Sequence, residues 1–140
     1  MITITRIGKK VNSTEIQDYI KKIKSIKILD IKEEKEGNKD LVKRKEGRKL
    51  LAKKIGFTVA LSEEGEMLDS IDFSKMIEKN PDITFIIGGT FGLSEEVKKG
   101  ANILISLSRL TFTHEMALLI LVEQIYRAER ILEGHPYHKI

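Results

Sequence analysis

The chain has no cysteine and no tryptophan, and only 2 of its 140 residues are proline. Without cysteine it can form neither a disulfide nor a thiolate metal site. No apolar run approaches the ~20 residues that a membrane-spanning helix requires. Residues 1–6 alternate like a strand and lack the apolar core of a signal peptide. We therefore expect a cytoplasmic protein that does not enter the membrane.

Charges of both signs are abundant and nearly balance. Lys and Arg number 25 and Asp and Glu 21, so the formal net charge is +4. A modest positive charge permits a polyanionic partner such as nucleic acid, but a lysine-rich surface without such a partner has the same net charge. With 41% hydrophobic residues, the composition suits one globular domain, which we expect to cover residues 1–140.

Apolar segments and helical patterns alternate along the chain. Strands are predicted at residues 1–7, 26–31, 57–61, 83–87 and 103–107. Helices are predicted between them and at residues 116–132, whereas residues 62–66 are predicted to form a turn. Residues 57–61 are almost continuously apolar, as in a parallel strand that is buried on both faces. The pattern predicts an α/β fold with a mostly parallel sheet flanked by helices.

Three of the predicted strands end in segments that suit a ligand site, because parallel α/β sheets bind ligands at the carboxyl ends of their strands. Leu61, Gly88 and Leu107 occupy such ends. Gly88, Gly89 and Gly92 are spaced i, i+1, i+4, which does not fit the i, i+2, i+5 dinucleotide fingerprint. The glycines form either a tight turn from strand to helix or a bare backbone surface that a ligand can approach closely.

The C-terminal part combines an apolar helix with a polar tail. Residues 116–122 are apolar nearly all round, which one short chain cannot easily cover, so we expect a homodimer. Glu123 and Arg127 are an i, i+4 pair, either a solvated ion pair or part of a site. His114 precedes the helix, and the other 2 of the 3 histidines lie in the tail. No pair of residues has the spacing of a histidine metal site, so no metal is expected.

Four motifs occur in order along the second half of the chain: IIGGTFGL at 86–93, SLSRLTFTH at 106–114, EQIYRA at 123–128 and PYHK at 136–139. Together they resemble the ribosomal RNA large-subunit methyltransferase H family of the SPOUT class, and the resemblance covers the full length. Glu46-Gly47 followed by Lys49 is similar to the family's Glu-Gly-x-Arg motif. Glu115 stands where the family has glutamine, which adds a negative charge.

The resemblance implies a SPOUT methyltransferase fold with a C-terminal trefoil knot, and a homodimer. It implies transfer of a methyl group from S-adenosylmethionine to N3 of a pseudouridine in 23S ribosomal RNA, free or in the assembled ribosome. The implied cofactor contacts are Leu61, Gly88, Leu107, Ser108, Arg109, Leu110, Thr111 and Phe112. RNA contacts are expected at Arg109, His114 and Arg127. Tyr137 and His138 are the predicted catalytic residues, because histidine changes charge near neutral pH.

Two other functions remain open from the sequence. One is a related knotted methyltransferase that acts on transfer RNA or on another ribosomal position. The other is a non-catalytic module that binds the ribosome and has kept the fold. Binding of S-adenosylmethionine separates this module from both enzymes.

Overall fold

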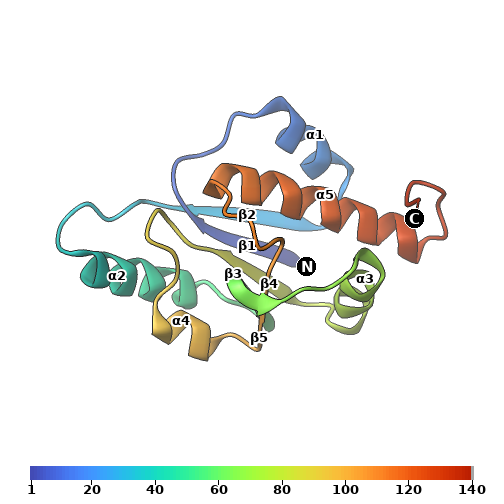
Figure 1. Ribbon diagram of the computed structural model, residues 1–140. Helices are drawn as coiled ribbons and strands as arrows, with labels where there is room; N and C mark the ends of the chain where they lie inside the picture. Colours follow the sequence, from blue (N-terminus) through green and yellow to red (C-terminus); the bar gives the residue numbers. More distant parts are fainter. Residues whose placement is uncertain (140) are drawn as a thin grey trace.

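The computed structural model describes residues 1–139, and Ile140, the last residue of the predicted tail and domain, lies outside them. The strands are β1 (Ile2–Ile7), β2 (Ile26–Ile31), β3 (Phe57–Glu66), β4 (Ile83–Ile87) and β5 (Ile103–Ile105). They form a 5-stranded sheet in the order β2-β1-β4-β3-β5, in which every neighbouring pair is parallel (Figure 1). The predicted α/β class is confirmed, whereas the trefoil knot stays a prediction.

Helices cover both faces of the sheet (Figure 1). The helices α1 (Thr14–Lys22), α3 (Ser70–Lys79) and α5 (His114–Leu132) pack on one face, and α2 (Lys39–Ala52) and α4 (Glu95–Gly100) on the other. Successive residues of a strand point to opposite faces. In β4, Phe85 therefore enters the core beneath α1, α3 and α5, and Ile86 enters the smaller core beneath α2 and α4.

The strand β3 is longer than predicted, and β5 is shorter. Residues 62–66 form no turn but continue β3, which pairs with β5 again after a register shift between Leu61 and Glu66. The Ser106 N–H donates to the Glu66 carbonyl at 2.9 Å. An added Cβ at Gly65 would lie 2.6 Å from the backbone of Ile105, so only glycine permits this approach. The segment is polar and has no strand pattern, so its extension depends on tertiary pairing.

Residues 1–139 contain no helix that is long and apolar enough to cross a membrane.

The helix α2 approaches α4 closely at Gly47. An added Cβ there would lie 2.5 Å from Ser94 Oγ and 2.8 Å from Val97 Cγ2. Ser94 is the N-cap of α4 and accepts a hydrogen bond from the Val97 N–H at 3.3 Å. Gly47 therefore sets the distance between the two helices and supports the end of the segment that joins β4 to α4.

We expect Gly47→Ala to lower the free energy of unfolding by about 1–3 kcal/mol, the usual cost of overpacking. The loss should occur although alanine forms helices better than glycine. Urea denaturation measures it. Gly100→Ala is the matched control, because its Cβ would meet only the flexible end of Leu51, at 3.2 Å. The control should stay within about 0.5 kcal/mol of the parent, and equal stabilities of the two variants would contradict the prediction.

Candidate cofactor cavity and C-terminal network

The carboxyl ends of β3, β4 and β5 open on a cavity of about 510 Å³, which we call the strand-end cavity. It is lined by residues 61–64 of β3, by the glycine loop (residues 87–93), and by most of residues 107–114. Lys43 of α2, Lys98 of α4 and Ala117 of α5 complete its wall. The volume falls in the range of small-molecule sites, and much of the wall is backbone or apolar side chain.

Most of the predicted cofactor contacts meet at this cavity. The predicted cofactor contacts that line it are Leu61, Gly88, Leu107, Ser108, Leu110, Thr111 and Phe112. Arg109 is exposed and is not among the lining residues. Of the predicted RNA contacts, His114 lines the cavity, whereas Arg127 lies further along α5.

The glycine loop is both a tight turn and a cavity wall. The Gly92 N–H donates to the Gly89 carbonyl at 3.0 Å, and Gly92 has a φ of +83°, which favours glycine. An added Cβ at Gly88 would lie 2.9 Å from the Gly92 carbonyl oxygen. A side chain at Gly88 would therefore push against the loop's own backbone. The tight turn that the sequence predicted is thus confirmed, whereas the close approach of a ligand stays a prediction.

The sequence reasoning missed the charged residues of the wall. Glu63, Glu64 and Lys98 line the cavity, and Lys98 Nζ donates to Glu64 Oε1 at 2.9 Å. This hydrogen bond raises the pKa of Lys98. A predicted turn at residues 62–66 gave these glutamates no role. The pairing of Glu64 with Lys98 of α4 joins residues 34 positions apart, for which the sequence contains no local signal.

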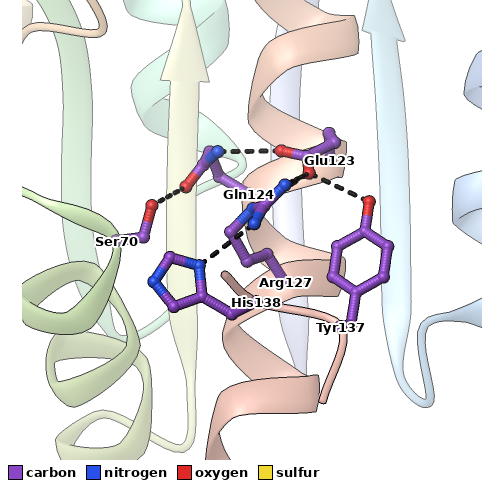
Figure 2. Close-up of polar contacts among 6 residues, drawn as sticks. All are labelled: Ser70, Glu123, Gln124, Arg127, Tyr137 and His138. Carbon is purple, nitrogen blue, oxygen red and sulfur yellow. Dashed lines mark hydrogen bonds and ion pairs between the residues drawn. The ribbon is translucent and has the colours of Figure 1, made fainter. Parts of the chain in front are cut away.

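The tail after α5 folds back on the helix (Figure 2). Glu123 Oε1 accepts hydrogen bonds from Arg127 Nη2 at 2.6 Å and Nε at 3.0 Å, and from the Tyr137 hydroxyl at 3.1 Å. Arg127 Nη1 lies 3.0 Å from His138 Nδ1, and its guanidinium lies 4.8 Å from the centre of the Tyr137 ring. Glu123 and Arg127 therefore belong to a network that includes both predicted catalytic residues.

The charges of the network fix where its protons lie. The hydrogen bond to Glu123 raises the pKa of Arg127, which stays charged. Burial, together with hydrogen bonding to Tyr19 and Glu123, raises the pKa of Tyr137, so its phenol stays protonated and donates. A guanidinium has donors only, so His138 Nδ1 accepts from Arg127. The proton of the neutral imidazole then lies on Nε2.

His138 faces a second cavity of about 450 Å³ between α3 and α5, which we call the tail cavity. Ser70 on its wall donates to Gln124 Oε1 at 2.7 Å, and Gln124 Nε2 donates to Glu123 Oε2 at 2.8 Å (Figure 2). The network thus extends from the tail to α3. Leu107 lines both cavities, which adjoin there, but neither Tyr137 nor His138 lines the strand-end cavity of its own chain.

Comparison with known proteins identifies the family of this chain. A family model described as "Predicted SPOUT methyltransferase" matches residues 1–138. Ribosomal RNA large subunit methyltransferase H of Acholeplasma laidlawii is 42% identical, over 99% of this chain and 97% of that protein. Its counterpart in Prochlorococcus marinus is 41% identical, over 99% and 94%. The chain belongs to this family of SPOUT methyltransferases, as its motifs indicated.

Solved structures share the fold at low sequence identity. A probable methylase family protein from Haemophilus influenzae superimposes with a TM-score of 0.63 at 9% identity, over 99% of this chain and 70% of that chain. The SpoU methyltransferase AviRb from Streptomyces viridochromogenes gives a TM-score of 0.51 at 14% identity, over 96% and 61%. These likenesses support the predicted SPOUT fold class.

We expect Glu123→Ala to release the tail, because it removes the acceptor that Arg127 and Tyr137 share. Hydrogen exchange followed by mass spectrometry should show the amides of residues 135–139 exchanging roughly tenfold faster or more. Glu133→Ala is the control, since Glu133 pairs with Lys24 and Arg130 at the same end of α5. Unchanged exchange in Glu123→Ala would show that other contacts hold the tail.

Proposed function

We propose that the chain transfers the methyl group of S-adenosylmethionine to N3 of a pseudouridine in 23S ribosomal RNA. One observation carries this proposal: the expected cofactor contacts gather around one strand-end cavity in a chain of this family. The relatives named above are ribosomal RNA large subunit methyltransferases, and this chain matches nearly their whole length. Because ribosomes work in the cytoplasm, we propose that the chain acts there.

The strand-end cavity suits a nucleoside with a charged tail. Leu61, Leu107 and Leu110 offer apolar surface to a planar base, and the backbone of the glycine loop offers polar groups to its edges. When bound, the cofactor supplies an electrophilic methyl group on a sulfonium. The contribution of the chain is alignment, because the nucleophile, the methyl carbon and the leaving sulfur must lie in line.

The reaction must also dispose of a proton. A bond forms between N3 and the methyl carbon, the bond between that carbon and sulfur breaks, and the proton on N3 passes to a base. We propose His138 as this base, with Tyr137 positioning the RNA. Arg127 occupies the Nδ1 lone pair of His138, and Nε2 carries the proton, so His138 becomes an acceptor only after it leaves Arg127. The tail network is therefore a resting arrangement.

A homodimer would give the tail a second place to bind. Within one chain Leu118, Leu121 and Val122 are buried, whereas Met116 is 46% exposed. We propose that a second copy covers the exposed side of α5. Because the tail does not line the strand-end cavity of its own chain, we propose that it completes the cavity of the partner subunit.

The RNA would approach over the basic rim of the strand-end cavity. Arg109 is exposed beside it, His114 lines it, and Lys43 reaches it from α2. We propose that these residues and other basic residues of α2 contact phosphates. Arg127 is held by Glu123, so we assign it an RNA contact only in the released state of the tail.

Leu110→Ala should weaken S-adenosylmethionine binding about tenfold, because burying a leucine side chain contributes about 1.5–3 kcal/mol. Leu110 is 72% exposed in the free chain, so the change should not disturb folding. Isothermal titration calorimetry measures the affinity. Ile55→Ala is the matched control, because Ile55 is 57% exposed and does not line the cavity. Equal affinities in the two variants would remove Leu110 from the cofactor site, and no binding by the wild type would overturn the proposed function.

A mixed dimer tests whether the tail acts on the partner subunit. One chain lacks residues 137–140 and keeps its cofactor cavity. The other carries Gly88→Val, which should displace the glycine loop, and keeps its tail. Purified with two different affinity tags, the mixed dimer should methylate ribosomal RNA in a single turnover at about half the wild-type rate, since one complete site forms from both chains. Mass spectrometry of the RNA locates the methyl group.

Each variant as a homodimer should be inactive in the same assay. The tail-deleted homodimer should nevertheless bind S-adenosylmethionine with normal affinity. An inactive mixed dimer, made from chains that fold and associate, would mean that the tail serves its own chain. If the methyl group is found at a position other than N3 of pseudouridine, the proposed substrate is wrong.

A further inference from the structure

A buried carboxylate lies directly behind the glycine loop. Glu46 of α2 is only 2% exposed. An added Cβ at Gly89 would lie 2.9 Å from Glu46 Oε1 and 3.4 Å from its Oε2. Gly89 itself lines the strand-end cavity, whereas Glu46 is not among the lining residues. A single layer of backbone, without a side chain, therefore separates this carboxylate from the cavity.

The carboxylate is not fully paired within the described chain. Oε2 accepts a hydrogen bond from the Glu34 N–H at 3.1 Å, and Oε1 has no hydrogen-bond partner among residues 1–139. Leaving a buried charged oxygen without a partner is unfavourable and requires an explanation. An apolar side chain of similar size would avoid this cost, so the fold alone does not account for a glutamate at this position.

Few positive charges lie near the carboxylate of Glu46. The groups that face it are Glu33 and Glu34 from the preceding loop, and Lys49 one turn further along α2. Lys49 already pairs with Glu34, at 3.2 Å. The neighbours from β1 and the glycine loop are Ile7 and Gly89, which carry no charge. The local field behind the loop is therefore negative, and burial raises the pKa of Glu46.

We propose that Glu46 is a positioning residue that favours a positively charged sulfonium in the strand-end cavity over the neutral thioether left after methyl transfer. This inference rests on the proposed function. The methyl donor and its product differ by one methyl group and one positive charge, so a nearby negative charge stabilises the donor selectively. The attraction acts across the backbone of Gly89, from a carboxylate that is only 2% exposed. The same selectivity would favour release of the product after each turnover.

The test compares three ligands by isothermal titration calorimetry: S-adenosylmethionine, S-adenosylhomocysteine, and sinefungin, which has an amine in place of the sulfonium. Glu46→Gln should weaken the two cationic ligands about tenfold and change the affinity for S-adenosylhomocysteine by less than about twofold. Glu129→Gln is the matched control, because its mostly buried carboxylate pairs with Arg130 on α5 and lines neither cavity. The control should change all three affinities by less than about twofold.

Equal weakening of all three ligands by Glu46→Gln would show that Glu46 only supports the loop, and this would overturn the inference, as would no change at all. Either result leaves the proposed function intact if the wild type binds S-adenosylmethionine. A wild type that binds none of the ligands would overturn both.

A second measurement does not depend on the folding of the Glu46 variant. Because its pKa is raised, Glu46 should lose its charge on acidification before ordinary carboxylates do. The preference of the chain for S-adenosylmethionine over S-adenosylhomocysteine should therefore fall as the pH is lowered through that pKa. The background Glu63→Gln, Glu64→Gln, His114→Gln removes the two glutamates and the histidine that line the same cavity. A preference that stays constant over this pH range would overturn the inference.

Discussion

The position of β4 between β1 and β3 is the constraint on which the rest of the structure depends. All residues of β4 are buried, and both neighbours pair with it in parallel. Because parallel strands end at the same edge, this arrangement brings the glycine loop beside the exit of β3, and β5 adds the third exit on the far side of β3. The strand-end cavity is a direct consequence of the strand order.

The helix α2 supports this cavity from behind through two adjacent residues. Gly47 allows α2 to approach the N-cap of α4, and Glu46 faces Gly89 at the start of the glycine loop. The loop is thus supported near both of its ends by one turn of helix. This arrangement gives a physical reason for the Glu-Gly motif. Gly47 has no room for a side chain against α4, and Glu46 places a carboxylate against Gly89, which has no side chain.

The tail is held against α5 by the charges of Glu123 and Arg127. Glu123 holds both Arg127 and Tyr137, and Arg127 in turn occupies the imidazole of His138. The side chains of Arg127 and Glu123 are only partly exposed, at 23% and 20%. Their interaction is therefore screened less than that of a surface pair. The two residues with the most suitable chemistry for catalysis are thus held beside the tail cavity, away from the strand-end cavity of the same chain.

By itself the sequence determined the α/β class, the strands at residues 26–31 and 83–87, and the position of the strand-end cavity beside Leu61, Gly88 and Leu107. Periodicity and turn chemistry suffice for these features, because they reflect the local burial of each segment. The family and the further cofactor contacts came from the resemblance of the motifs. Only the tertiary structure decided that β3 continues to Glu66, that Glu46 is buried behind Gly89, and that His138 is held by Arg127. Each of these depends on contacts with residues on another segment, and a local pattern contains no information about which segment that will be.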